Sequence, residues 1–386
     1  MVATATGPLV IVGAGLAAYT LAREWRKLDA ETPLTIVTAD DGAAYSKPML
    51  SNAFSKGQSA QDLIQQTPEE VAERLNAKLI THTEVTHLDL PTQTLHLNKG
   101  TPIGWQRLVL ATGATPLKAP VEGNAVDQVL SINSRQDFSR FEQALKGKKR
   151  VLIMGAGLIG CEYANDLAAA GYQVEVVAPS ESLLRGLLPA QLGQALKTEL
   201  ERIGVRFWLG PMVSRVDLDA SGALQVALTN GQQRQTDLIL SAIGLKPSIK
   251  LAREAGLAVQ SGICVDRRLQ SASDRVYALG DCAEVDGLNL MYVMPLMNAA
   301  RALARTLAGQ PTDLHWPAMP VTVKTPACPL VVYPPRRDGD WQIEGSGANL
   351  AAVCRSGEDV LGFALSGDRI KERNNWLKAV PPLFSQ

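Results

Sequence analysis

The sequence predicts an α/β protein with two Rossmann-like dinucleotide-binding domains and a small C-terminal α+β domain. Two segments carry this prediction, residues 9–18 (LVIVGAGLAA) and residues 150–160 (RVLIMGAGLIG). Each places an apolar run of strand length before a glycine-rich turn and a helical pattern after it. A third observation is that the sequence changes to proline clusters and alternating residues from Pro317 onward. This change indicates a separate C-terminal domain.

Both glycine-rich turns have the spacing of a dinucleotide-binding fingerprint. The first glycine makes the tight turn, the second lets the backbone approach a pyrophosphate, and the third position lets helix and strand pack closely. These positions are Gly13, Gly15 and Ala18 in the first turn and Gly155, Gly157 and Gly160 in the second. A pyrophosphate would then lie at the positive end of each helix dipole. Two turns imply two nucleotides, and a protein that holds two nucleotides usually moves electrons between them.

The remaining pattern places these turns in domains. In the first unit we expect strands over residues 33–39 and 108–111, short strands over 78–97, and a helix over 68–77. In the second unit we expect helices over 158–170 and 189–203, each followed by glycine, and strands over 172–178, 205–209 and 237–243. Short strands over 262–280 and an alanine-rich helix over 295–308 return to the first unit. The predicted domains are 1–115 with 245–316, 116–244, and 317–386.

Composition argues against several classes of protein. The 386-residue chain has 38 basic and 38 acidic side chains, so its net charge is zero. Balanced charge does not favour nucleic acid or an anionic membrane as a partner, and no apolar stretch reaches the ~20 residues that span a bilayer. Residues 1–6 (MVATAT) lack the features of a signal peptide. We therefore expect a cytoplasmic protein with no nucleic-acid partner and no membrane partner.

Cysteine and histidine usage gives no sign of a metal centre. The five cysteines and four histidines are scattered, and no C-x-x-C pair occurs. We expect no metal site, and we interpret the cysteines as small buried thiols.

Six segments together resemble a known family. They are residues 9–18, 45–50 (YSKPML), 108–114 (LVLATGA), 155–162 (GAGLIGCE), 277–284 (YALGDCAE) and 323–326 (VKTP). The chain resembles, over essentially its whole length, the FAD-dependent pyridine nucleotide-disulfide oxidoreductases, which have a glutathione-reductase-like fold. The C-terminal segment favours the rubredoxin-reductase branch. The resemblance implies FAD at the first turn and NADH at the second.

The resemblance also implies which side chains meet the flavin. Besides the first turn, the expected FAD contacts are Asp40, Lys47, Pro48, Val85, Thr112, Gly113, Gly280, Asp281 and Lys324. Asp40 follows the second strand, where a carboxylate can accept hydrogen bonds from ribose hydroxyls. Asp281 would accept one from a ribityl hydroxyl, with a helix N-cap as its alternative role.

Three side chains are expected to be catalytic, namely Lys47, Glu162 and Lys324. By resemblance, Lys47 and Glu162 project toward the flavin at its nicotinamide face, where a cation favours the reduced anionic ring and a carboxylate holds that cation in place. The alternative is an ordinary ion pair between the two. Lys324 is the second candidate cation, with a surface lysine on a strand as its alternative.

The end of the second strand in the second unit departs from the usual pattern. A carboxylate is expected there to meet the ribose 2′-hydroxyl, but residues 176–181 (VVAPSE) offer Ala178, which leaves Glu181 in the following loop as the candidate. The nearest arginine is Arg185, and a 2′-phosphate would favour an arginine at the turn itself. NADH is therefore favoured over NADPH.

The missing cysteines restrict the reaction. Disulfide reductases of this superfamily place two cysteines on the helix after the first flavin loop, and related oxidases place one near the position of Asn52. Residues 49–55 (MLSNAFS) contain none, so electrons are expected to pass directly to an outside acceptor. We expect a rubredoxin-type one-electron iron protein. The alternatives are a ferredoxin or the rubredoxin domain of a flavodiiron protein (flavorubredoxin), and, from another class, a slow flavin-binding redox sensor or scaffold.

Overall fold

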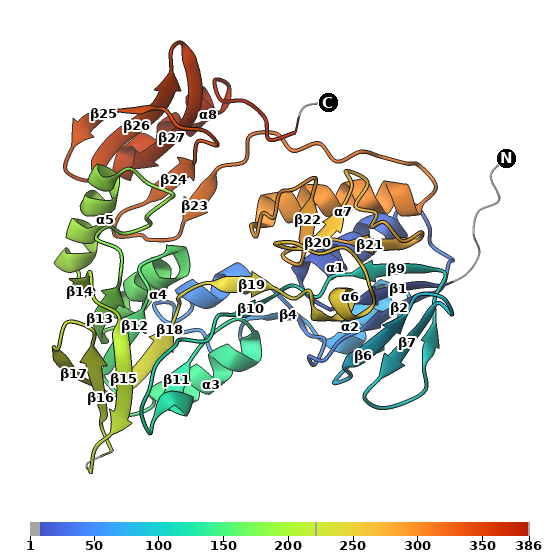
Figure 1. Ribbon diagram of the computed structural model, residues 1–386, viewed down its shortest axis with the longest axis horizontal. Helices are drawn as coiled ribbons and strands as arrows, with labels where there is room; N and C mark the ends of the chain where they lie inside the picture. The colour runs from blue at the N-terminus through green and yellow to red at the C-terminus, as the bar shows by residue number, and fades with distance from the viewer. Residues whose placement is uncertain (1–7, 221, 385–386) are drawn as a thin grey trace.

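The computed structural model describes residues 8–220 and 222–384, and it divides into three lobes (Figure 1). The N-terminal segment, on which the expectation about a signal peptide rests, lies outside the described residues. No helix in the described ranges is long and apolar enough to cross a membrane.

The first lobe is built on a five-stranded parallel sheet. Its strand order is β21 (Val276–Ala278), β9 (Arg107–Leu110), β1 (Leu9–Val12), β2 (Leu34–Val37) and β5 (Ala77–Ile80). All four residues of β1 are buried, as expected for a strand covered on both faces. Helices α1 (Leu16–Arg26) and α7 (Val293–Leu307) pack against each other in this lobe. The strand β21 and helix α7 come from the later part of the chain, so the lobe is discontinuous in sequence.

The second lobe repeats the arrangement. Its parallel sheet has the order β11 (Val129–Leu130), β18 (Leu238–Ser241), β12 (Arg150–Met154), β13 (Gln173–Ala178) and β14 (Arg206–Leu209). Its helices are α3 (Arg135–Leu145), α4 (Leu158–Ala169) and α5 (Ala190–Arg202). Two antiparallel strands, β10 (Ala114–Pro116) and β19 (Leu245–Pro247), lie between the two lobes and connect them (Figure 1).

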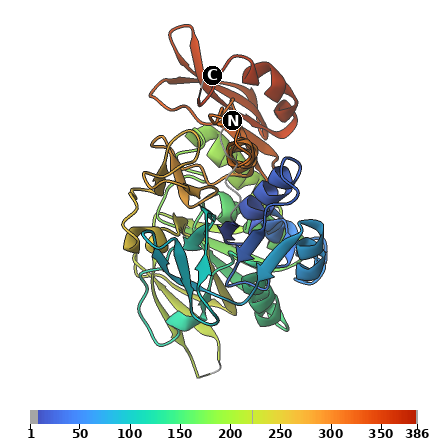
Figure 2. The same ribbon diagram turned by 90° about the vertical axis from the view of Figure 1, so that its right-hand side faces the viewer.

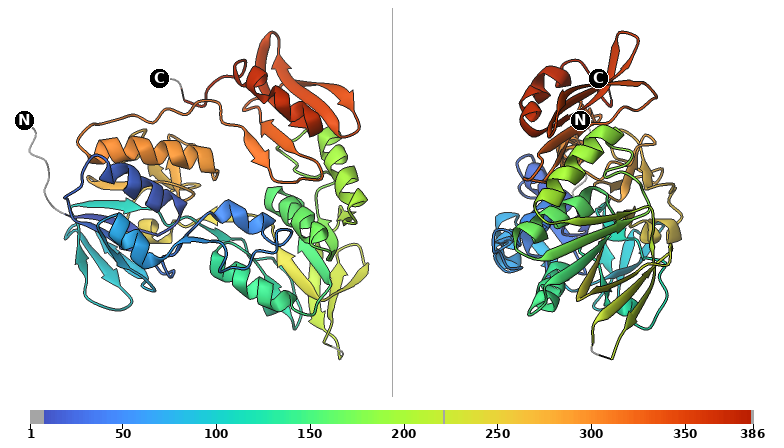
Figure 3. Two further views of the ribbon diagram at one scale, coloured as in Figure 1. Left: turned by 180° about the vertical axis from the view of Figure 1, so that it is seen from behind. Right: turned by 90° about the vertical axis from the view of Figure 1, so that its left-hand side faces the viewer.

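The third lobe is an antiparallel sheet of order β23 (Val321–Val323), β24 (Leu330–Tyr333), β27 (Asp359–Ser366), β26 (Asn349–Ser356) and β25 (Asp340–Ser346). It is followed by the 3₁₀ helix η3 (Gly367–Glu372) and the short helix α8 (Arg373–Leu377). One face of this sheet shares a hydrophobic core with α4 and α5 of the second lobe, which explains why the two lobes lie side by side in both views of Figure 3.

The smaller elements complete the lobes. They are β3 (Ala44–Tyr45), the 3₁₀ helix η1 (Lys47–Asn52), β4 (Ile64–Gln66), α2 (Pro68–Arg74), β6 (Val85–Asp89), β7 (Thr94–Leu97), β8 (Ile103–Gly104), η2 (Val126–Gln128), β15 (Val213–Leu218), β16 (Leu224–Leu228), β17 (Gln233–Thr236), α6 (Lys250–Glu254), β20 (Ile263–Val265) and β22 (Ala283–Val285). Figure 2 shows the first lobe facing the viewer, with α1 below α7.

The α/β fold class predicted from sequence is confirmed. Most predicted helices and strands lie within two residues of the observed ones, but the helix predicted over 68–77 ends at Arg74. Several observed elements were not predicted, and helix α3 is one of them. Helix α3 begins at a capping box in which Ser134 and Asp137 satisfy each other's backbone N–H groups, a signal present in the sequence. The β15–β17 meander was also missed. The predicted domain boundaries remain a proposal.

Candidate functional site

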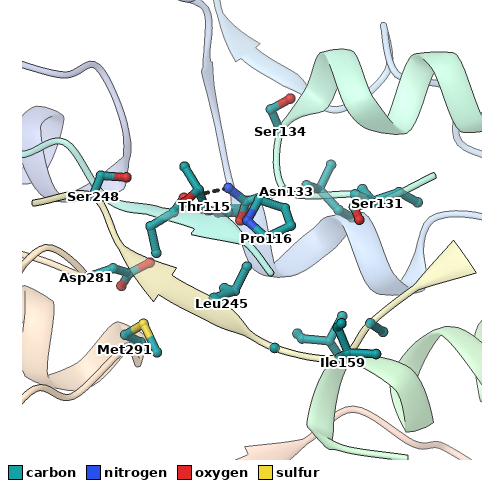
Figure 4. A pocket seen from close by; sticks show the side chains of 18 of the residues that line it. Thr115, Pro116, Ser131, Asn133, Ser134, Ile159, Leu245, Ser248, Asp281 and Met291 are labelled. Atoms are coloured by element: carbon teal, nitrogen blue, oxygen red, sulfur yellow. Dashed lines mark hydrogen bonds between the residues drawn. The ribbon is translucent and has the colours of Figure 1, made fainter. Parts of the chain in front are cut away.

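The three lobes enclose one large cleft of about 2020 Å³. Both glycine-rich turns, the strands β10 and β19, the start of α7 and the segment from Met319 to Lys324 all contribute to its lining. In Figure 4, Asp281 and Met291 lie on one side of β19, while Ile159 at the start of α4 lies further along the cleft. The volume exceeds the ~300–1,000 Å³ of an ordinary small-molecule pocket, so the cleft has room for more than one nucleotide.

The first turn forms an open cradle at the start of α1. Gly13 has φ +114°, and a Cβ there would lie 2.2 Å from the carbonyl oxygen of Ala111, so only glycine fits. A Cβ on Gly15, by contrast, would meet no protein atom within 4 Å. No side chain caps α1, and its first turn has no acidic residue. The free N–H groups of this turn therefore face the cleft as an anion-binding site.

The second turn repeats this geometry at the start of α4. Gly155 has φ +110°, and its Cβ would lie 2.5 Å from the Ala242 carbonyl oxygen. Gly157 has open space around a Cβ, whereas a Cβ on Gly160 would lie 2.1 Å from the carbonyl oxygen of Gly155. No side chain caps this helix either. Gly157 thus leaves room for a ligand, while Gly160 allows the helix to pack on its strand.

An orphaned polar atom supports a ligand beside the second turn. The Ser241 hydroxyl oxygen at the end of β18 is buried, has no hydrogen-bond partner among the described residues, and lines the cleft. A buried hydroxyl without a partner costs free energy, so such groups are usually satisfied by a ligand or a water molecule. The residues present therefore fit a dinucleotide with its pyrophosphate at the start of α4. Sequence reasoning missed Ser241, although its position at the end of a strand beside the fingerprint strand is readable.

Glu162 is the junction of the three lobes. Its side chain is 0% exposed, and its oxygen Oε2 accepts a hydrogen bond of 2.6 Å from the hydroxyl of Ser51 in η1. Its Oε1 accepts a 2.9 Å bond from the backbone N–H of Lys324, whose ammonium also forms an ion pair with the carboxylate. A buried carboxylate needs a cation and several donors to stay charged, and here the third lobe supplies the cation.

This arrangement changes the expectation for Lys47. Among the described residues, the cation that pairs with Glu162 is Lys324, so the expected pair of Lys47 with Glu162 is not the one the structure forms. The reason is the third lobe, whose segment after β23 reaches α4. Burial lowers the pKa of the Lys47 amine, and the charges of Asp281 and Asp137 oppose that shift. Lys47, Glu162 and Lys324 nevertheless all line the cleft.

The two expected ribose and ribityl partners also line the cleft. Asp281 lies beyond the end of β21. Burial raises the pKa of its carboxyl group above the usual value, although the charge of Lys47 opposes this shift. Asp40 follows β2 and accepts hydrogen bonds from the backbone N–H of Asp41, at 2.7 Å, and from the side chain of Gln136. Burial raises the pKa of Asp40.

The remaining expected residues divide into three groups. Pro48, Val85, Thr112 and Gly113 line the cleft. Ala18, Gly160 and Gly280 lie behind its surface, where a Cβ on Gly280 would meet the Cβ of Ala17 at 2.8 Å. Glu181 is exposed and lies outside the cleft, next to a small separate hollow formed with α5. The carboxylate expected for the ribose 2′-hydroxyl is therefore not part of the lining, which ends in Pro179 and Ser180.

None of the five cysteines lines the cleft. Four are buried and one is partly exposed, and burial raises the pKa of Cys161 to about 12 and that of Cys328 to about 11. Thiols with raised pKa values are poor nucleophiles. The described residues also contain no group of three or more histidine, cysteine or acidic side chains that could hold a metal ion.

Fold and cleft together define the class of protein, a two-domain dinucleotide-binding fold with an added C-terminal lobe. The family model for pyridine nucleotide-disulphide oxidoreductases matches residues 7–304, and that for a rubredoxin binding C-terminal domain matches residues 313–380. The chain therefore belongs to the pyridine nucleotide-disulphide oxidoreductase family.

Individual relatives cover the whole chain. It is 46% identical to a rubredoxin-NAD(+) reductase of Alcanivorax borkumensis over 98% of this chain and 99% of that protein. It is 40% identical to a nitric oxide reductase FlRd-NAD(+) reductase of Vibrio vulnificus over 95% and 96%. A solved ferredoxin reductase of Rhodopseudomonas palustris has the same fold with TM-score 0.88 and 24% identity over 97% and 95%. An NADH:rubredoxin oxidoreductase of Clostridium acetobutylicum gives TM-score 0.81 and 19% identity over 97% and 94%.

Proposed function

We propose that this protein is an NADH-dependent reductase that carries FAD and passes electrons to a rubredoxin-type iron protein. The observation that carries the proposal is that two uncapped helix starts line the same large cleft, since this provides two anion-binding cradles facing one space. The curated relatives named as rubredoxin-NAD(+) reductases, which align with the whole chain, support it.

The proposed assignment gives each cradle one nucleotide. The turn of Gly13 and Gly15 holds the FAD pyrophosphate, with Asp40 accepting from the ribose and Asp281 from the ribityl chain. The turn of Gly155 and Gly157 holds the NADH pyrophosphate, with Ser241 as an added donor beside it. When bound, FAD supplies the exchange between a two-electron hydride donor and a one-electron acceptor.

The chain's own residues hold charge and exclude water at the meeting point of the two cradles. Lys47 and Lys324 bring positive charge to the cleft, which stabilises negative charge that develops there. Glu162 fixes the ammonium group and the backbone N–H of Lys324. Because η1, α4 and the segment after β23 close around Glu162, this region is shielded from bulk water, and electrostatic effects are stronger there.

The third lobe is proposed to bind the acceptor, because residues 313–380 match the rubredoxin binding domain model. A second acceptor is favoured by the Vibrio vulnificus relative, a nitric oxide reductase FlRd-NAD(+) reductase. The rubredoxin domain of such a flavorubredoxin is therefore the alternative partner. We also propose that the protein works in the cytoplasm, where NADH is available, which cell fractionation with an antibody would test.

The experiment is steady-state electron transfer from NADH to a panel of purified acceptors. The proposal predicts the highest kcat/KM for rubredoxin or for an isolated flavorubredoxin rubredoxin domain, with ferredoxin lower. A much higher kcat/KM for ferredoxin would refute the partner. NADPH in place of NADH tests the coenzyme, and slow bleaching of the flavin by NADH would favour the redox-sensor alternative.

A further inference from the structure

Helix α4 presents three buried polar side chains along one face, and together they hold two segments of chain, residues 51–55 and 324–327. Glu162 binds Ser51 and Lys324, as described above. Asp166, four residues later, accepts hydrogen bonds from the backbone N–H groups of residues 54 and 55 at 2.9 and 3.0 Å. Between them in sequence, Asn165 accepts a 3.0 Å bond from the backbone N–H of Ala327 in the third lobe.

The segment that Asn165 holds is a tight turn that begins directly after Lys324. Its backbone is closed by a 2.9 Å hydrogen bond from the N–H of Cys328 to the carbonyl oxygen of Thr325. The hydroxyl of Thr325 also donates to the carbonyl oxygen of Cys328 at 2.7 Å. A turn closed twice in this way moves as a unit, so a contact to Ala327 also restricts Lys324.

Asn165 does not touch the space where a ligand would lie. Its side chain is 4% exposed and is not part of the cleft lining. Glu162 and Lys324 do line the cleft. Glu162 lies about one helical turn before Asn165, and Lys324 lies three residues before Ala327. The contact is thus placed to act on the cleft through Lys324 rather than directly.

We propose that Asn165 is a positioning residue that holds the turn after Lys324 on α4 and so fixes the ammonium group of Lys324 at the cleft. The proposal rests on the proposed function only in that Lys324 then faces a bound flavin. Through this contact, helix α4 of the second lobe sets the position of a cation that belongs to the third lobe.

The test is a double-mutant cycle on the FAD-loaded protein with Asn165→Leu, Lys324→Met and the combination. Leucine keeps the branched shape of asparagine but cannot accept a hydrogen bond, and methionine removes the charge of lysine. The readouts are the midpoint potential of the bound flavin and its rate of reduction by NADH in stopped flow. FAD content and melting temperature are measured on every variant.

Removing a fixed cation makes the reduced flavin less stable, so Lys324→Met should shift the midpoint potential to more negative values. Asn165→Leu should shift it in the same direction and slow reduction by NADH roughly tenfold. In the Lys324→Met background, the Asn165→Leu change should add no further shift, because its effect passes through the missing ammonium group.

The matched control is Ser55→Ala, which removes a side-chain hydrogen bond to Asp166 on the same helix face while the two backbone donors remain. It should leave the potential unchanged. Equal shifts from Asn165→Leu in both backgrounds, or a lower melting temperature with an unchanged potential, would overturn the proposal. If Asn165→Leu does not fold, Asn165→Ser replaces it, since a serine hydroxyl is too short to reach the amide of Ala327.

Failure of this proposal is separable from failure of the proposed function. The wild-type protein is assayed in parallel for NADH-dependent reduction of rubredoxin. If the wild type reduces rubredoxin but the two substitutions shift the potential additively, only the role of Asn165 is contradicted. If the wild type does not reduce rubredoxin but the variants still shift the potential non-additively, only the acceptor assignment is contradicted.

Discussion

The two glycines Gly157 and Gly160 occupy the same turn but should respond oppositely to alanine. Gly157 has φ −78° and ψ −172°, which any residue adopts, and a Cβ there has no protein atom within 4 Å. Gly157→Ala should therefore fold as well as the wild type. Its methyl group would, however, occupy the space through which the NADH pyrophosphate approaches the backbone.

The cost to NADH binding can be worked from the contact that is lost. A hydrogen bond to a charged group contributes about 1.5–3 kcal/mol, and 1.4 kcal/mol is a factor of ten. The KM for NADH should therefore rise roughly 10- to 100-fold in Gly157→Ala, while FAD content stays normal because FAD is assigned to the other turn.

Gly160→Ala should instead damage the fold. Its Cβ would lie 2.1 Å from the carbonyl oxygen of Gly155 and 3.0 Å from the carbon of that group, and backbone atoms cannot rotate away. Overpacking of this kind costs about 1–3 kcal/mol, which lowers the melting temperature by about 2–4 °C for each kcal/mol in a domain of this size.

The assay measures melting temperature, FAD content and the KM for NADH, with ferricyanide as electron acceptor so that rubredoxin docking does not enter. The reasoning is refuted if Gly157→Ala melts early while Gly160→Ala does not. Loss of FAD from Gly157→Ala with an unchanged KM for NADH would mean that the two nucleotides are assigned to the wrong turns.

Three further predictions follow from charges and thiols. Lys47→Met should slow flavin reduction by NADH yet raise the melting temperature of the apoprotein. Burial lowers the pKa of this amine, so its charge costs stability at neutral pH. An unchanged reduction rate would remove Lys47 from the mechanism. Asp237 accepts hydrogen bonds from Arg150 that lower its pKa to about 2. This carboxylate therefore stabilises the fold fully above the unfolded-state pKa near 3.8, and the contribution is lost on acidification toward pH 2. Asp237→Asn should be less stable than the wild type at pH 7 and equal to it near pH 2, and a pH-independent difference in chemical denaturation would argue against the ion pair. Thiol alkylation of the native protein should leave flavin reduction intact, since no cysteine lines the cleft, whereas inactivation with the fold preserved would place a thiol in the mechanism.

Local features of the sequence were sufficient to predict the two cradles. A strand, a glycine turn and a helix are encoded within about a dozen consecutive residues, and each glycine has a separate geometric reason. The positive φ of Gly13 and Gly155 and the open space at Gly15 and Gly157 agree with the roles assigned to them.

The partners of the site residues could not be predicted in this way. The ion pair between Glu162 and Lys324 joins residues 162 positions apart, and it depends on how the third lobe packs against α4. No periodicity in the sequence encodes that packing, and the family resemblance suggested Lys47 as the partner of Glu162. The path of the loop after β13 also depends on tertiary packing. The sequence therefore did not show that Glu181 lies outside the cleft.

The most direct test of the central proposal is an anaerobic titration of the FAD-loaded protein with NADH, followed by oxidised rubredoxin, with absorbance recorded throughout. One equivalent of NADH should bleach the flavin, and rubredoxin should then restore the yellow colour while two equivalents of rubredoxin are reduced for each NADH consumed. A flavin that NADH does not bleach, or a bleached flavin that rubredoxin does not reoxidise, would contradict the account.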